Sequence, residues 1–294
     1  MLKVFATSNI HYAVPELGIY GRDFPSISLT GRVCGLMCKH CHGRLLENML
    51  SVESPDELRR LGMRLKAEGI SGVLISGGCD GSGRVPFEHY MDSIKYLKDL
   101  GMKVFMHSGL VDEMRACMIK ELGIDAVLID FVVHEGAVKE VLGLSDVNAY
   151  VESVKTLIRF DIPVIPHVIV GLYRGLPSKE FEAIDMLYDL RPKAAVFVIF
   201  TPYPGTPLES STPPSPNYVI DVLRYSRLRL EDMSLSLGCM RPRGEDFVGV
   251  EVEAVKLGFE GISFPSVSTL NYLVENGIRF EVINECCASV YKHV

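Results

Sequence analysis

The sequence has no run of about 18 apolar residues, the length that a membrane-spanning helix needs, although 48% of its 294 residues are hydrophobic. Residues 1–10 also lack the order of basic, apolar and small residues that marks a signal peptide. We therefore expect no transmembrane segment and no membrane partner. The expected location is cytoplasmic, where thiols stay reduced.

A basic excess is missing too, since 37 acidic residues outnumber 30 Lys and Arg and give a net charge of −7. Proteins that bind nucleic acid usually carry a basic stripe, so we expect no nucleic-acid partner. Trp is absent, but Cys is not, because the chain has eight. In a reducing compartment, cysteines indicate metal binding or catalysis before they indicate disulfides.

Repeats and low-complexity tracts are absent, and short β-rich runs alternate with amphipathic helical patterns. Most of the runs are almost wholly apolar, which is typical of parallel strands buried on both faces. Glycines such as Gly69 and Gly101 follow helices where a left-handed cap is needed. The expected strands are 26–30, 72–76, 103–107, 126–131, 164–170, 195–200, 234–238 and 261–264, and the expected helices are 55–68, 87–100, 111–122, 147–160, 179–190, 218–232, 247–257 and 267–276.

Eight such units in about 235 residues predict an α/β fold, a closed (β/α)8 TIM-type barrel. It would form a single domain over residues 1–294. A partial (β/α)6 barrel followed by a separate C-terminal region is the alternative. Residues 278–294 are expected to form a final strand and a tail that contributes to the mouth of the active site. In such barrels the chemistry lies on the loops after the strands.

Three cysteines follow the first expected strand. Cys34, Cys38 and Cys41 have C-x3-C-x2-C spacing, and their thiolates can reach three irons of one [4Fe–4S] cube. The fourth iron then has no protein ligand and can bind a substrate or a cofactor. A zinc site with His40 or His42 as its fourth ligand is the alternative.

The spacing, the strand placement and the chain length resemble the radical S-adenosylmethionine (SAM) superfamily. The resemblance implies that the open iron chelates the amino and carboxylate groups of SAM, with His40 near the adenine. Ser76, Gly77 and Gly78 resemble the family's glycine-rich segment, whose backbone holds the methionine amino group. A loop histidine without a role and an ordinary turn are the alternatives for these residues.

Two later segments resemble the family less specifically. Residues 167–172, which include Ile169 and Gly171, resemble a fifth-strand segment beside the adenine. Residues 201–208 resemble a Pro-Gly-Thr-Pro-Leu stretch of biotin-synthase-like members. Barrel packing and a proline-rich turn would explain them equally well. Four polar residues at the expected mouth are candidates for contacts with SAM or substrate: His107, Ser108, Asp130 and His134.

Four further cysteines occupy places that can converge over one barrel mouth. Cys79 follows the second strand, Cys239 follows the seventh, and Cys286 and Cys287 lie in the tail. We expect them to hold an auxiliary iron–sulfur cluster, whereas individually buried cysteines are the alternative. Adjacent residues of a regular strand point to opposite faces, so only one of Cys286 and Cys287 would be a ligand in a strand, whereas both could serve in a loop.

Two residues near these cysteines are interpreted separately. Arg241 is a candidate ligand of the auxiliary cluster, because biotin synthase uses an arginine in this way; a surface salt bridge is the alternative. Cys117 falls within an expected helix and is predicted to be a small buried side chain.

The segments 76–79 (Ser-Gly-Gly-Cys), 238–242 (Gly-Cys-Met-Arg-Pro) and 286–287 (Cys-Cys) together resemble the two-component lipoyl synthases. The chain lacks the N-terminal cysteine triplet and the C-terminal Arg-Ser-Ser-Tyr of the usual lipoyl synthase. It also lacks cysteines in the fourth and fifth strands, where biotin synthase has them. The resemblance implies a sulfurtransferase in which a 5′-deoxyadenosyl radical removes hydrogen from an octanoyl chain, and the carbon radical takes sulfide from the auxiliary cluster.

The implied partners are an octanoylated lipoyl-carrier protein or peptide, a sister radical SAM component, and a reductant such as ferredoxin or flavodoxin. Other functions stay open at this point. They are biotin-synthase-like sulfur insertion, a radical SAM mutase without a second cluster, a non-catalytic iron–sulfur protein, and a zinc-binding interaction module.

Overall fold

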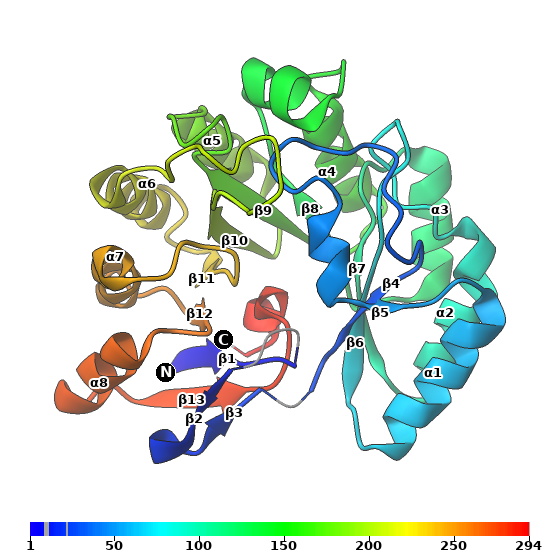
Figure 1. Cartoon of the computed structure of the whole chain (residues 1–294), viewed down its shortest axis with the longest axis horizontal. Coiled ribbons are helices and arrows are strands. Elements are labelled where there is room, and N and C mark those ends of the chain that lie inside the picture. Colours follow the sequence, from blue (N-terminus) through cyan, green and yellow to red (C-terminus); the bar gives the residue numbers. More distant parts are fainter. Residues whose placement is uncertain (9–11, 22, 294) are drawn as a thin grey trace.

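One curled parallel sheet organises the structure, a computed structural model that describes residues 1–8, 12–21 and 23–293 (Figure 1). All strand pairs in this sheet are parallel. From one edge to the other, its eleven strands are β13 (Phe280–Ile283), β1 (Leu2–Phe5), β12 (Gly261–Ser263), β11 (Ser234–Leu237), β10 (Ala194–Ile199), β9 (Val164–Val170), β8 (Ala126–Asp130), β7 (Lys103–His107), β6 (Gly72–Ser76), β4 (Ser26–Ser28) and β5 (Leu50–Ser51).

The eight strands expected from the sequence run in chain order from β4 through β6 to β12, which confirms the predicted α/β fold. Each is followed by a helix within a few residues of its expected bounds. The sheet differs from the expectation in one respect, because the described strands end at two separate edges, β13 and β5, and form no continuous hydrogen-bonded ring.

The helices are α1 (Pro55–Ala67), α2 (Met91–Asp99), α3 (Glu113–Leu122), α4 (Ala149–Arg159), α5 (Glu180–Leu190), α6 (Pro216–Arg229), α7 (Glu245–Lys256) and α8 (Val267–Glu275).

Smaller elements complete the described chain. A separate antiparallel pair, β2 (Ala13–Val14) and β3 (Ile19–Tyr20), lies beside the sheet. Five short helical segments are η1 (Pro15–Leu17), η2 (Arg44–Asn48), η3 (Glu88–Tyr90), η4 (Ala137–Leu142) and η5 (Cys287–Lys292). No helix in the described ranges is long and apolar enough to cross a membrane.

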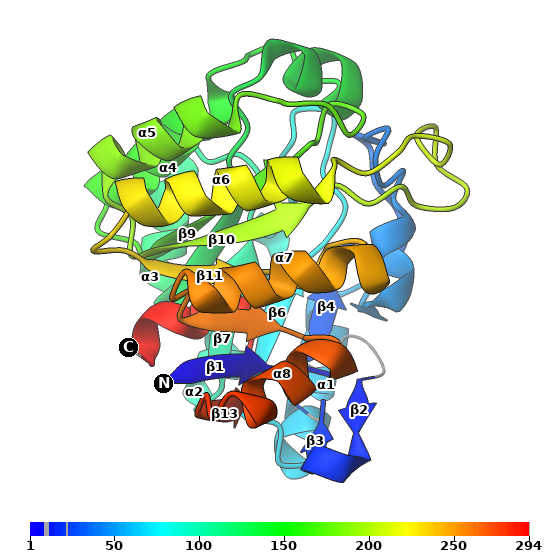
Figure 2. The ribbon, with the colours of Figure 1, turned by 90° about the vertical axis from the view of Figure 1, so that its left-hand side faces the viewer.

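The two faces of the sheet bury different sets of side chains, as the period-two geometry of a strand requires. Along β6, Val73 and Ile75 join the cluster that includes helical residues such as Leu58, whereas Leu74 joins a smaller cluster with Phe105. The helices cover the outer face (Figure 2), and the smaller cluster therefore lies inside the curl. This inner face carries several serines and histidines, so large apolar side chains do not fill it completely.

The C-terminal segment enters the curl, where Figure 1 shows η5 (red) surrounded by the strands. The Tyr291 hydroxyl donates to the Asp125 carbonyl at 2.9 Å, and Lys292 pairs with the Asp125 carboxylate at 2.9 Å. Glu285 pairs with Lys103, the first residue of β7. These anchors lie at the amino ends of the strands. The expected final strand and tail are present through residue 293, and residue 294 lies outside the described residues.

One prediction about packing was wrong. Cys117 is exposed on α3, whereas its neighbour Ala116 is fully buried. The buried face of α3 includes Ala116 but not Cys117. The hydrophobic pattern of a short helix does not determine the rotation of the helix closely enough to distinguish these two neighbours.

We expect Leu58→Ala and Met63→Ala, both on α1, to differ sharply in stability. Leu58 is 0% exposed and Met63 is 47% exposed. The first change should lower the free energy of unfolding by about 2–5 kcal/mol because it leaves a cavity. The second should change it by no more than about 0.5 kcal/mol. Denaturant unfolding of the two variants under identical conditions measures this, and similar values for both would contradict the packing described.

Candidate functional site

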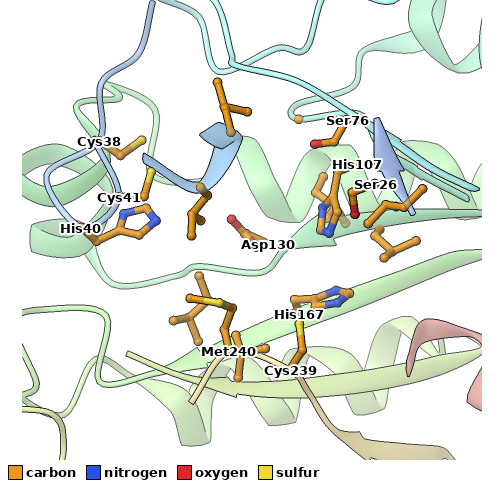
Figure 3. A pocket seen from close by; sticks show the side chains of 18 of the residues that line it. Ser26, Cys38, His40, Cys41, Ser76, His107, Asp130, His167, Cys239 and Met240 are labelled. Atoms are coloured by element: carbon orange, nitrogen blue, oxygen red, sulfur yellow. The ribbon is translucent and has the colours of Figure 1, made fainter. Parts of the chain in front are cut away.

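A cavity of about 410 Å³ lies inside the curl and is lined by most of the residues predicted to form the site. Figure 3 shows part of it, with Cys38 and Cys41 on one side, His107, His167 and Cys239 on the other, and Asp130 between them. The predicted residues that line it are Cys34, Cys38, His40, Cys41, Ser76, Gly77, Gly78, Cys79, His107, Asp130, Ile169, Cys239, Cys286 and Cys287.

The first cysteine group lies on the loop between β4 and η2. Met37, inside this loop, has a left-handed backbone with φ of 50°, which is rare for a side chain of its kind and turns the loop sharply. The Cys38 and Cys41 side chains share a hydrogen bond, which lowers the pKa of Cys41 to about 4 and raises the pKa of Cys38. A low pKa favours the thiolate, the form of cysteine that binds metal.

The end of β6 presses against this loop. A Cβ atom on Gly78 would lie 2.0 Å from the Val33 carbonyl oxygen and 2.6 Å from the Cys34 Cα. The Gly78 N–H donates to the Thr30 hydroxyl at 2.7 Å, and the Gly35 N–H donates to the Cys79 carbonyl at 2.7 Å. Only glycine permits this approach, so the Gly77–Gly78 segment holds the cysteine loop in place and lines the cavity beside it.

Cys79 lies beside the first cysteine group, and its role as a ligand of the auxiliary cluster stays a prediction. The Cys34 Sγ lies 3.8 Å from the Cys79 carbonyl oxygen. Burial, the neighbouring Cys34 and then Asp130 raise the pKa of Cys79 to about 12. The physical reason is the strand order, because β6, which Cys79 follows, pairs with β4, which precedes the cysteine loop.

The remaining three cysteines form a second group. Cys286 and Cys287 are buried. Cys239 is exposed overall, but its thiol forms a hydrogen bond with the Cys287 thiol. This bond lowers the pKa of Cys287, but a hydrogen bond with Cys286 and burial outweigh it and raise the value to about 12. The Cys287 thiol thus contacts the thiols of both Cys239 and Cys286 at the cavity wall.

The donors in the first group suit a multi-iron cluster. Within the described ranges, no three His, Cys, Asp or Glu side chains form a group that could hold a single metal ion. In a [4Fe–4S] cluster, by contrast, each thiolate binds a different iron. Three cavity-lining thiols on one loop fit that arrangement and leave one iron for another ligand.

Arg241 does not line the cavity, so the structure does not support its predicted role as a ligand. Its side chain is completely buried and donates to Glu251 through Nη2 at 2.6 Å and Nε at 2.9 Å, and to the Gly238 carbonyl at 2.6 Å. Arg243 donates to the Cys239 carbonyl at 2.9 Å. The two arginines therefore fix the Cys239 loop from outside the cavity, and burial also excludes the surface salt bridge considered as the alternative.

The two imidazoles deep in the cavity carry little charge. The rings of His107 and His167 lie 5.3 Å apart, and burial lowers the pKa of His107 to about 3 and that of His167 to about 4. Burial raises the pKa of Asp130 to about 6, against the opposing effect of His40. Both imidazoles are therefore neutral near pH 7 and offer hydrogen bonds rather than charge.

Some predicted positions lie elsewhere, and some lining residues escaped prediction. Gly171 does not line the cavity; its φ of 76° and the hydrogen bond from its N–H to Glu180 at 2.6 Å mark a turn. Ser108 and His134 are not lining residues either. Ser26 and Ser263 are lining residues that were missed. Their alternation with Ile27 and Ile262 along the strands was the available signal.

Comparison with known proteins identifies the family. The family model for the radical SAM superfamily matches residues 28–188, more than half of the chain, including the first cysteine group and the glycine segment. The chain therefore belongs to the radical SAM superfamily and is a radical SAM enzyme. The second cysteine group lies beyond the matched residues.

Individual relatives are distant. Biotin synthase of Sorangium cellulosum is 22% identical over 156 residues, covering 53% of this chain and 45% of the relative. Biotin synthase of Leptospira biflexa is 22% identical over 216 residues, covering 71% and 59%. The chain thus spans about half the length of these curated relatives. The solved structure of HydG, a maturase of the [FeFe]-hydrogenase, has the same fold, with a TM-score of 0.67 at 16% identity over 99% of this chain and 66% of that one.

We expect Gly78→Ala to lose iron at the first cysteine group, because its methyl group would overlap the Val33 carbonyl and displace the Cys34 loop. Gly81→Ala, on the same loop after β6, is the control, since its methyl group meets nothing within 4 Å. After anaerobic reconstitution, the first variant should hold about four irons fewer than the control. Equal iron contents would show that the close approach does not shape the site.

Proposed function

We propose that this radical SAM enzyme is a sulfurtransferase that inserts sulfur at an unactivated carbon of a protein-bound octanoyl chain, in the formation of the lipoyl cofactor. The observation that carries the proposal is the second cysteine group, Cys239, Cys286 and Cys287, in the same cavity as the first. A second cysteine group can hold an auxiliary cluster, which would supply the sulfide that sulfur insertion needs. The low-identity likeness to biotin synthases supports sulfur insertion as the reaction class.

The two groups divide the chemistry between them in this proposal. Cys34, Cys38 and Cys41 would hold the SAM-binding [4Fe–4S] cluster, and the second group would hold an auxiliary iron–sulfur cluster. Together these cofactors supply a 5′-deoxyadenosyl radical and a sulfide. The protein residues fix the relative positions of the groups and exclude water, which is their usual contribution to cofactor chemistry.

The residues around SAM would act through backbone groups, side-chain hydrogen bonds and apolar contacts. Ser76, Gly77 and Gly78 line the cavity next to Cys34, where they would hold the methionine part of SAM. His40, whose Nδ1 is buried without a partner, is available to the adenine, and Ile169 offers an apolar contact on β9. His107 stays neutral and would orient SAM or substrate without adding charge.

The cavity suits an alkyl substrate between the two cysteine groups. Leu74, Leu128 and Val198 line it from the inner faces of β6, β8 and β10. Small-molecule and chain-like ligands bind in such cavities through apolar walls with a few placed polar groups. An octanoyl chain matches these walls.

The proposed partners follow from this assignment. An octanoylated lipoyl-carrier protein or peptide would present the chain, and ferredoxin or flavodoxin would reduce the first cluster. The resemblance to the two-component lipoyl synthases implies that a sister radical SAM component would insert the other sulfur. Biotin-synthase-like insertion into a free small molecule is the second candidate, which the named relatives favour.

Iron content tests whether there are two clusters. The anaerobically reconstituted protein should hold about eight irons per chain, and Cys287→Ala about four. Cys117→Ala, which removes an exposed cysteine outside the cavity, should keep about eight. A wild-type content of about four would remove the sulfur-insertion proposal and leave the radical SAM enzyme.

Product mass identifies the substrate class. We expect an octanoyl-lysine peptide incubated with the protein, SAM and a reductant to gain one sulfur, seen by mass spectrometry, and fragmentation to show which carbon carries it. The Cys287→Ala variant should leave the peptide unchanged. A wild-type protein that never thiolates the peptide but does thiolate a free small acid would favour the second candidate.

A further inference from the structure

The loop that carries Cys239 has two arginines and no acidic residue between β11 and α7. Arg241 Nη2 lies 2.6 Å and Arg243 Nη1 lies 3.7 Å from the same oxygen of Glu251. Among the residues that the structure describes, no other carboxylate forms an ion pair with either arginine. Because guanidinium groups stay protonated, one carboxylate serves two cations, which leaves a surplus of positive charge among these three side chains.

Both arginines are fixed by hydrogen bonds to the ends of two neighbouring strands. Arg243 donates to the Cys239 carbonyl at 2.9 Å and to the Phe264 carbonyl at 2.6 Å. Arg241 donates to the same Phe264 carbonyl at 3.0 Å and to the Gly238 carbonyl at 2.6 Å. The two guanidinium groups therefore connect the loop after β11, which carries Cys239, to the residue that follows β12.

Phe264 has a left-handed backbone at the point where the two arginines meet. Its φ of 46° is rare for an aromatic residue. Such a conformation persists only where the surrounding contacts over-determine it, and it is typical of functional sites. Phe264 lines the cavity together with Cys239. The arginines thus hold a strained part of the cavity wall in place while their own side chains lie outside the described lining.

The charges of the arginines reach the thiol of Cys239. A hydrogen bond with the Cys287 thiol and burial raise the pKa of Cys239, and the charges of the two arginines act against this rise. The Arg241 side chain is 0% exposed and lies against Glu251, whereas the Arg243 side chain is 43% exposed and lies farther from that carboxylate. Arg243 therefore carries the surplus charge, and it also donates directly to Cys239.

This inference rests on the auxiliary cluster of the proposed function and concerns the charge beside it. The net charge and the surroundings of an iron–sulfur cluster set its reduction potential. Sulfur insertion adds an electron to such a cluster. A carbon radical contributes one electron to the new carbon–sulfur bond and the sulfide contributes two, so one electron remains on iron. A fixed positive charge near a ligand stabilises this added negative charge.

We propose that Arg243 is a positioning residue for the auxiliary cluster, which fixes the Cys239 loop and raises the reduction potential of the cluster through its positive charge. Removal of the charge should make the reduced cluster less stable and lower its potential. A purely structural role, through hydrogen bonds alone, is the alternative, and it predicts that the charge of the side chain has no effect.

The test compares Arg243→Gln with Arg243→Lys in a variant that retains only the second site, Cys34/Cys38/Cys41→Ala, after anaerobic reconstitution. Gln keeps hydrogen-bond donors without charge, whereas Lys keeps both. In a redox titration followed by EPR, Gln should lower the ratio of reduced to oxidised cluster about tenfold, which corresponds to about 59 mV for one electron. Lys should stay close to the background. Arg159→Gln, a charge removed at the end of α4, should leave the potential unchanged.

Iron content and potential together separate the possible failures. A background that binds no iron would overturn the auxiliary cluster and the sulfur-insertion proposal with it. If the background holds about four irons, equal behaviour of the Gln and Lys variants, or a larger effect of Lys, would overturn the role of Arg243 while the cluster stands. An equal shift in Arg159→Gln would also overturn it, because any surface charge would then suffice. A Gln variant that loses iron while the Lys variant keeps it would support the need for the charge.

Discussion

The close approach of Gly78 to the Cys34 loop is the contact on which the geometry of the site depends. It brings the end of β6 against the cysteine loop after β4, and any side chain at this position would overlap the Val33 carbonyl. The same approach lets the Cys79 carbonyl accept hydrogen bonds from the loop. The cysteines and the segment that would hold SAM are therefore placed by one backbone contact between neighbouring strands.

The second cysteine group depends on a different constraint, the entry of the C-terminal segment into the curl of the sheet. Tyr291 and Lys292 anchor this segment at the amino ends of the strands, which leaves Cys286 and Cys287 facing the cavity. Arg241 and its partner Glu251 hold the Cys239 loop against them from outside. Two groups that are far apart in the sequence thus share one enclosed space.

The sequence allowed the eight strands to be predicted because buried parallel strands are short apolar runs bounded by glycine caps. It did not reveal that β1 lies between β12 and β13, since that pairing joins opposite ends of the chain. The cysteine spacing predicted the first group, but the position of Cys79 beside it required the order of the strands. Arg241 was misassigned because its partner, Glu251, lies on the following helix, α7. Ser263 resembles any other strand serine until the alternation with Ile262 shows which face of the sheet its side chain occupies.

The three thiolates of the loop after β4 would hold a cluster with an open iron for SAM. The most direct measurement is the formation of 5′-deoxyadenosine and methionine from SAM by the air-free, reduced protein. We expect both products from the wild-type chain and neither from the variant that lacks Cys34, Cys38 and Cys41. A wild-type protein that binds four or more irons yet never cleaves SAM, or a triple variant that still does, would contradict it.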